Sequence, residues 1–177
     1  VSAEQVDAAM TLAEQRHGPI QILVNNAGIG ISARFMQAEM KDLDAMLDVN
    51  FKGAWHCTRR ALPGMLDAGW GRVVNVASIS GLQGFPYICG YTVSKHAMIG
   101  LTRSLAAEYA GQCVAFAAVC PSYVDTDILT ESLDNIVAKT GMSRAEARAK
   151  IAAMNPEGRI LAPAEVAAAV VKLCRAD

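Results

Sequence analysis

Short apolar segments that alternate with longer amphipathic segments constrain this sequence more than any other feature. Residues 20–24, 72–77 and 113–119 are rich in Val, Ile, Leu and Ala and are flanked by turn-forming residues, which is typical of buried strands. Mostly apolar strands that alternate with helices indicate a parallel sheet covered on both faces, so we predict an α/β fold. Apolar residues at helical spacing predict helices over 2–17, 40–66, 91–110, 128–139, 143–153 and 163–174.

Local signals set several of the predicted helix boundaries. Ser2 with Gln5, and Ser143 with Glu146, have the spacing of a capping box at a helix N-terminus. Pro163 suits a first helical turn. The 40–66 helix is expected to be disturbed near positions 53 and 63, which hold Gly and Pro.

Composition excludes several classes of function. Hydrophobic residues make up 53% of the 177 positions and charged residues 19%, which is enough for a buried core and excludes a disordered chain. The formal net charge is −1, so no basic excess is present for nucleic-acid binding. The longest apolar run, 113–120, is far shorter than the roughly 20 residues that cross a bilayer. We therefore expect neither a nucleic-acid nor a membrane partner.

The five cysteines are widely spaced and form no C-x-x-C pair, so neither a zinc site nor a redox motif is predicted, and we expect no metal. The chain opens without a signal-peptide pattern. Because an odd number of cysteines without such a signal suits reduced thiols, we expect a cytoplasmic protein.

Three loops follow the predicted strands, at 25–28, 78–90 and 121–127. Ligands of open parallel sheets bind beyond the carboxyl ends of the strands, so this edge is the expected site. Just after the second loop, Tyr91 and Lys95 share one face of the predicted helix. A nearby ammonium stabilises a phenolate and lowers the tyrosine pKa from about 10 toward a range useful for acid–base catalysis.

Four motifs occur in a fixed order: Asn-Asn-Ala-Gly at 25–28, Asp-Val-Asn at 48–50, Asn-Val-Ala-Ser at 75–78 and Tyr-Thr-Val-Ser-Lys at 91–95. With these motifs the sequence resembles the short-chain dehydrogenase/reductase family through nearly the whole chain. The resemblance implies a Rossmann-like doubly wound parallel sheet, incomplete in this chain, and an oxidoreductase that uses NAD or NADP.

The resemblance also implies a role for each matched residue. Tyr91 would donate the proton to a carbonyl or act as base toward an alcohol, and Lys95 would lower its pKa and bind the nicotinamide ribose. Ser78 would polarise the substrate oxygen, and Asn50 would hold a water that links Lys95 to solvent. The implied cofactor-binding residues are Asn25, Ala27, Gly28, Tyr91, Lys95, Pro121, Val124 and Thr126. The family usually has Gly where this chain has Ser122, so a positive φ there would strain the backbone.

The glycine-rich phosphate-binding loop of the family is absent from this sequence, as is its last strand. We therefore expect 1–177 to be a single dinucleotide-binding oxidoreductase domain that lacks about two N-terminal βαβ units and the last strand. Two functions remain open. The first is hydride transfer between a nicotinamide cofactor and a carbonyl or secondary alcohol, with a 3-oxoacyl or 3-hydroxyacyl thioester as one candidate substrate. The second is a truncated, non-catalytic relative that serves as a binding or assembly partner.

Two further expectations concern the substrate and the assembly. A segment at 128–155 is long enough for a lid, and its basic residues would either meet the phosphates of a coenzyme A thioester or form a solvated helix face. The family resemblance implies a homo-oligomer, dimer or tetramer, that assembles through 40–66 and 91–110. The residues expected around the mouth of the substrate pocket are Phe85, Tyr87, Cys89, Tyr123, Ile128 and Leu129.

Overall fold

The computed structural model describes residues 2–175 and contains two compact units. The first unit comprises the chain up to Cys120 together with its C-terminal end from Val170, and the second comprises Pro121–Ala169.

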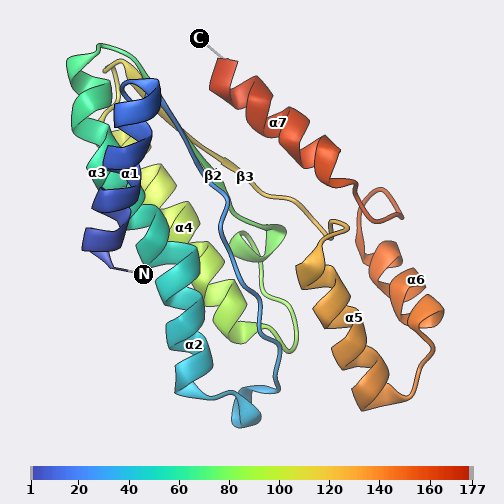
Figure 1. The fold of residues 1–177 in the computed structure, drawn as a ribbon. Coiled ribbons are helices and arrows are strands. Elements are labelled where there is room, and N and C mark those ends of the chain that lie inside the picture. The colour runs from blue at the N-terminus through green and yellow to red at the C-terminus, as the bar shows by residue number, and fades with distance from the viewer. Residues whose placement is uncertain (1, 176–177) are drawn as a thin grey trace. The chain divides into compact units, whose positions relative to one another are not determined.

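A three-stranded parallel sheet forms the centre of the first unit (Figure 1). Strands β1 (Ile22–Asn25), β2 (Gly71–Val76) and β3 (Val114–Val119) are hydrogen-bonded in that order, with Asn25 opposite Asn75 and Val76 opposite Val119. The three predicted strands are thus confirmed, although β1 begins two residues later than expected and includes Asn25.

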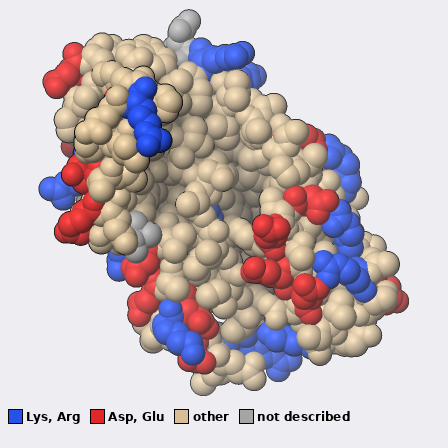
Figure 2. Space-filling view, in the orientation of Figure 1, with Lys and Arg blue, Asp and Glu red and all other residues tan. Residues whose placement is uncertain are grey.

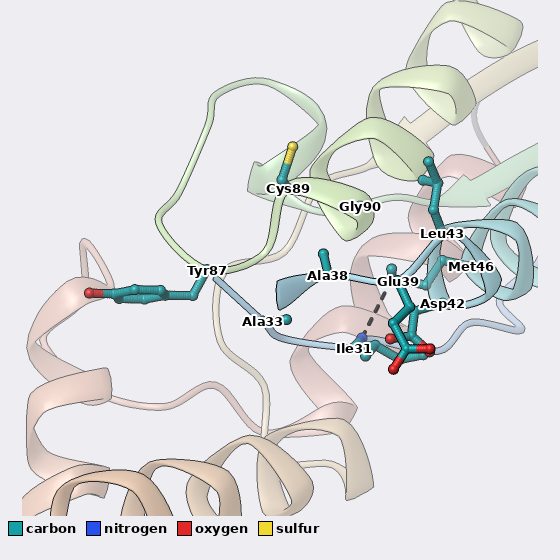
Figure 3. Close-up of a pocket in the computed structure, with 10 residues that line it drawn as sticks. All are labelled: Ile31, Ala33, Ala38, Glu39, Asp42, Leu43, Met46, Tyr87, Cys89 and Gly90. Atoms are coloured by element: carbon teal, nitrogen blue, oxygen red, sulfur yellow. Dashed lines mark hydrogen bonds between the residues drawn. The ribbon is translucent and has the colours of Figure 1, made fainter. Parts of the chain in front are cut away.

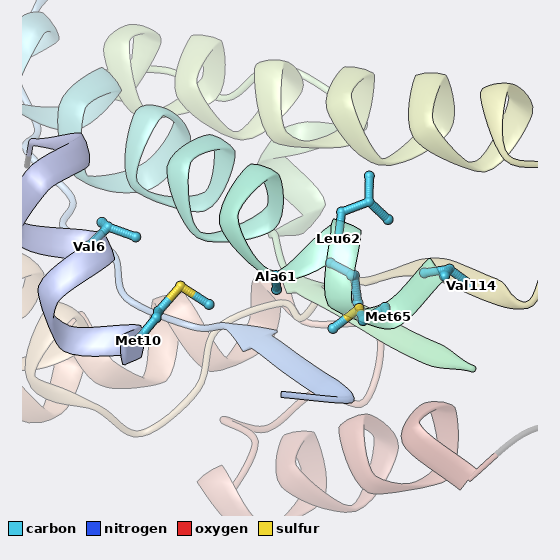
Figure 4. Close-up of a cluster of buried hydrophobic side chains, with 7 residues drawn as sticks. Val6, Met10, Ala61, Leu62, Met65 and Val114 are labelled. Carbon is cyan, nitrogen blue, oxygen red and sulfur yellow. The ribbon is translucent and has the colours of Figure 1, made fainter. Parts of the chain in front are cut away.

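Helices α1 (Ala3–His17), α3 (Gly53–Asp67) and α4 (Cys89–Glu108) lie on one side of this sheet (Figure 1). The capping box of α1 is present, with the Ser2 hydroxyl accepting from Gln5 N and the Gln5 side chain accepting from Ser2 N. The core contains α1, α3 and sheet residues, shown in Figure 4: Val6, Met10, Ala61, Leu62, Met65, Val73 and Val114.

The predicted helix over 40–66 is not continuous. It consists of α2 (Met40–Leu47), a π-helical turn η2 (Asp48–Lys52) and α3. The interruption ends at Gly53, as expected, but α3 continues through Pro63. The π turn was not predicted, and its Asn50 side chain pairs with the backbone of Ile29, which is distant in sequence. Two 3₁₀ turns, η1 (Phe35–Gln37) and η3 (Ile79–Gly81), were not predicted either, since three residues show no periodicity.

The second unit contains α5 (Asp127–Thr140), α6 (Arg144–Met154) and the first part of α7 (Pro163–Arg175), all close to their predicted positions. Gly141, with φ of 70°, ends α5, and the Ser143–Glu146 capping box starts α6. The two helices pack through a core of Leu129, Leu133, Ala147 and Ile151.

The sheet is only partly covered by the described chain. Ile22 and Val24 on β1 are 46% and 40% exposed, so the expected covering of both faces is incomplete at this strand. This agrees with a doubly wound sheet that is incomplete in this chain. Within residues 2–175, none of the helices is long and apolar enough to cross a membrane.

Candidate functional site

The chain that leaves the carboxyl ends of β1 and β2 brings several of the predicted site residues together. Gly28 follows β1, Ser78 follows β2, and α4 carries Tyr91 and Lys95 in its first two turns. Asn50 comes from the π turn between α2 and α3. The roles of these residues stay predictions.

Asn50 is fully buried and pairs with the backbone of one residue in the loop after β1. Its Oδ1 accepts from Ile29 N at 2.8 Å, and its Nδ2 donates to Ile29 O at 2.9 Å. Nδ2 also donates to Ser94 Oγ at 2.9 Å. A π turn displaces a side chain from the regular helical positions and is frequent at functional sites. Asn is unfavourable in a helix interior, but here the π turn places the Asn50 side chain where each of its two amide hydrogens has an acceptor.

Ser94 is a site residue that the sequence motifs alone did not single out. Its side chain has no exposed area, accepts from Asn50 Nδ2, and donates to Tyr91 O at 2.8 Å. Ser94 therefore joins the π turn to the backbone of Tyr91. The signal in the sequence was its position, three residues after Tyr91 and one before Lys95 on the same helix.

Lys95 is 4% exposed, which is unusual for an ammonium. Burial lowers its pKa from 10.5 to about 8, and the nearby Cys120 acts in the opposite direction. Lys95 Nζ donates to Val76 O at 3.0 Å, the only hydrogen bond it makes within residues 2–175. An ammonium has three donors, so two remain for a ligand.

Tyr91 is half-buried, and its ring centroid lies 5.6 Å from Lys95 Nζ. Ser78 is 9% exposed and caps η3, with its Oγ accepting from Ser80 N at 3.1 Å. Burial raises the pKa of the Cys120 thiol, while a hydrogen bond from the Ser78 backbone acts to lower it.

Asn25 contributes its side-chain amide to the interior. Its Nδ2 donates to Thr58 Oγ1 at 3.1 Å and to Asn75 Oδ1 at 2.8 Å. Asn75 Nδ2 in turn donates to Thr102 Oγ1 at 2.8 Å. This buried chain of hydrogen bonds joins β1 and β2 to α3 and α4, so Asn25 has a structural role beside the predicted contact with a cofactor.

Gly28 provides a test of whether the residues present fit a nicotinamide cofactor. A Cβ at this position would lie 3.3 Å from Asn50 Oδ1 and 3.5 Å from Lys95 Nζ, so the absence of a side chain leaves the approach to the ammonium open. A ribose diol supplies acceptors for the unused donors of Lys95. Ala27 beside it is small and exposed. The arrangement fits the cofactor.

Pro121, Val124 and Thr126 belong to the second unit, and their predicted contacts with a cofactor stay predictions. The expected strain at Ser122 is absent, because Tyr87 is the one non-glycine residue with positive φ in the described chain. In this unit the segment at 123–125 forms a short parallel bridge with Leu161, in which Asp125 N donates to Leu161 O and Leu161 N to Tyr123 O.

The residues expected around the pocket mouth divide between the two units. Tyr87 and Cys89 line a pocket in the first unit together with Met46, whose sulfur accepts from Ile31 N (Figure 3). The Tyr87 side chain points away from the other lining residues and is 61% exposed. In the second unit, Leu129 is a core residue, 3% exposed.

Two of the four basic residues of the predicted lid are paired with carboxylates. Arg144 binds Asp134, and Arg148 forms two hydrogen bonds with Asp125 at 3.2 and 2.9 Å. On the face in Figure 2, basic side chains lie among acidic ones. Within residues 2–175, no group of three or more His, Cys, Asp or Glu is arranged to hold a metal ion.

A parallel sheet whose carboxyl edge carries a buried lysine one helical turn from a tyrosine is the arrangement expected of a Rossmann-type α/β oxidoreductase. The family model described as short chain dehydrogenase matches residues 1–137. The chain belongs to the short-chain dehydrogenase family. It is therefore an oxidoreductase that uses NAD or NADP, which favours the enzyme over the non-catalytic alternative.

Individual relatives agree with this assignment. The chain is 34% identical over 172 residues to a D-beta-hydroxybutyrate dehydrogenase of Cupriavidus necator, covering 97% of this chain and 67% of that protein. It is 34% identical over 170 residues to the 3-oxoacyl-acyl-carrier-protein reductase FabG of Thermotoga maritima, covering 96% of this chain and 65% of that protein. The chain thus spans about two thirds of the length of these relatives.

Solved structures of the family are also similar. A variant of the actinorhodin polyketide ketoreductase, crystallised with NADPH, matches with a TM-score of 0.92 and 32% identity, covering 98% of this chain and 67% of that chain. The protein ElxO with NADP bound matches with a TM-score of 0.86 and 31% identity, covering 99% of this chain and 68% of that chain.

Proposed function

We propose that the protein interconverts a carbonyl compound and the corresponding secondary alcohol, with a 3-oxoacyl or 3-hydroxyacyl thioester as the preferred substrate class. The observation that carries this proposal is the buried Lys95 ammonium, one helical turn from Tyr91 and beside the open approach at Gly28. The name of the reductase relative supports a 3-oxoacyl thioester, and the name of the dehydrogenase relative supports a 3-hydroxy acid.

The bound nicotinamide supplies or accepts the hydride at the carbon that bears the substrate oxygen. In the direction of reduction, the Tyr91 phenol donates its proton to that oxygen, and the Ser78 hydroxyl donates a hydrogen bond to it. Lys95 stabilises the phenolate that remains. Each amide hydrogen of Asn50 is already taken, by Ile29 O or Ser94 Oγ, so a water at this residue would have to be the donor to one of its acceptor atoms.

Absorbance assays with NADH and NADPH against ketones, secondary alcohols and 3-oxoacyl thioesters test the activity. Tyr91→Phe is expected to lower kcat by about 10²- to 10⁴-fold, the usual contribution of a general acid or base, and to leave the fold intact. Tyr109→Phe is the matched control, because Tyr109 packs on Phe116 at the other end of α4. Normal turnover by Tyr91→Phe would reject the proposed role of the phenol.

The carrier of the thioester is a separate question. Since Arg144 and Arg148 are paired with carboxylates, we propose that the lid does not depend on the phosphates of coenzyme A. The 3-oxoacyl thioesters of coenzyme A and of a short cysteamine arm should then have similar kcat/KM values. A strong preference for the coenzyme A form that is lost in Arg148→Gln would contradict this.

We also propose that 1–177 acts as a single oxidoreductase domain in a cytoplasmic homo-oligomer, a dimer or tetramer. The single-domain interpretation is supported by similarity to relatives over 96% or more of the chain. Self-association is supported by Trp55 on α3 and Val93 on α4, each 45% exposed. All five cysteines are free, which suits a reducing compartment. A monomer in sedimentation experiments at micromolar concentration would contradict the oligomer.

A further inference from the structure

Asn155 is the most heavily bonded buried side chain of the second unit. It is 4% exposed and follows directly after α6. Its Oδ1 accepts from Tyr123 N at 2.9 Å, and its Nδ2 donates to Tyr123 O at 2.9 Å and to Arg159 O at 2.6 Å. One amide thus satisfies backbone groups of two segments that lie 32 and 4 residues away in sequence.

Two of these bonds hold the backbone of Tyr123, just before Val124 and Thr126, which are predicted to contact the cofactor. Tyr123 directly precedes Val124, and the parallel bridge between Val124 and Leu161 begins where Asn155 holds Tyr123. Within residues 2–175 this bridge has only two backbone hydrogen bonds, so it gives little pairing of its own. The amide of Asn155 extends the pairing by supplying both a donor and an acceptor to the backbone of Tyr123.

We propose that Asn155 is a positioning residue of the enzyme, whose side-chain amide sets the backbone at 123–125 and so orients Val124 and Thr126 toward the cofactor. This inference rests on the proposed function. A segment held in its binding conformation before the cofactor arrives loses less conformational entropy on binding, so its contribution is to affinity. The proton-transfer residues Tyr91 and Lys95 belong to the first unit and are not part of this cluster.

Asn155→Ala removes all three bonds, and Asn155→Asp keeps the shape and the acceptor for Tyr123 N while losing the donor to both carbonyls. We expect both variants to bind NADPH or NADH, whichever the wild type binds, about tenfold more weakly in fluorescence titrations. The KM for the cofactor should rise similarly, while kcat at saturating cofactor and its pH profile stay as in the wild type. Hydrogen exchange of the Tyr123, Asp125 and Leu161 amides should accelerate in Asn155→Ala.

Ser143→Ala is the matched control, because it removes the capping box of α6 in the same unit without contact to 123–125. It should keep the wild-type affinity for the cofactor and the slow exchange of those amides. The inference is overturned if the Asn155 variants bind cofactor as tightly as the wild type, or if Ser143→Ala loses as much affinity as they do. If Asn155→Ala does not fold, the isosteric Asn155→Asp decides. A wild-type protein that binds neither cofactor rejects the proposed function instead.

Discussion

Replacing Lys95 with methionine should change how the stability of the protein depends on pH. Burial lowers the pKa of Lys95 to about 8 in the folded protein, whereas the unfolded chain keeps the ordinary 10.5. Between these two values the unfolded state binds more protons than the folded state, so the free energy of unfolding of the wild type rises with pH relative to Lys95→Met. The difference between the folded pKa of about 8 and the unfolded pKa of 10.5 corresponds to about 3 kcal/mol in the free energy of unfolding.

The direction of this pH dependence follows from the cost of burying the Lys95 ammonium in the folded state. Below pH 8 the folded wild type carries a buried ammonium whose one hydrogen bond within residues 2–175 goes to Val76 O, and the full penalty of burial is present. As the pH rises through the folded pKa the amine loses its proton, and the penalty disappears by pH 10.5. Methionine has a similar length but no charge, so this contribution is missing from the variant.

Urea unfolding, followed by circular dichroism without cofactor, measures the effect at several pH values across that range. The difference between the free energies of unfolding of wild type and variant should change by about 3 kcal/mol from below pH 8 to pH 10.5. Because the Cys120 thiol interacts with Lys95, the pair is also compared in a Cys120→Ala background. A difference that stays constant across the range would refute the assignment of a charged, buried Lys95.

Two further substitutions test the framework around the site. Asn75→Ala leaves Asn25 Nδ2 and Thr102 Oγ1 each with one hydrogen-bond partner fewer in a buried setting. We therefore expect the free energy of unfolding, measured in urea, to fall by about 2–3 kcal/mol. A decrease near zero would show that the network contributes nothing to stability. Gly81→Ala places a Cβ 2.8 Å from Lys95 O and 2.9 Å from an Ile99 carbon, so α4 and η3 must move apart. We expect about 1–3 kcal/mol of destabilisation in the same assay, together with a reduced kcat. A variant with unchanged stability and kcat would contradict the close approach.

The parts of the fold that the sequence predicted are those determined by neighbouring residues. The apolar runs became β1, β2 and β3, and both capping boxes start helices where Ser2 and Ser143 indicated. That Tyr91 and Lys95 lie close together on one helix was predicted because residues four apart share a helix face, while their catalytic roles stay predictions. In each case the physical cause acts within a few positions, so a local pattern is sufficient evidence.

The parts that the sequence did not predict depend on partners that are distant in the chain. The π turn at Asp48–Lys52 makes sense only once Asn50 is seen to pair with Ile29, 21 residues earlier. In the same way, the bonds of Asn155 involve Tyr123, 32 residues earlier. A lone Asn in a helical pattern, or just after one, carries no mark of such a partner.

Asn50 and Asn155 make the same kind of pairing with the backbone, one in each unit. Ile29 and Tyr123 each lie in a segment that follows a strand, and in each an Asn side chain pairs with both the backbone N–H and the C=O, although Tyr123 O also accepts from Leu161 N. Backbone groups that lose their partner inside a protein are costly, so a side-chain partner stabilises the backbone where regular strand pairing ends. Asn supplies it, because its side-chain amide has one acceptor and two donors in the arrangement of a peptide bond; Leu would provide neither, and Asp would face the carbonyl with a second acceptor. Asn50 and Asn155 thus each pair with the backbone of a segment that contains predicted site residues.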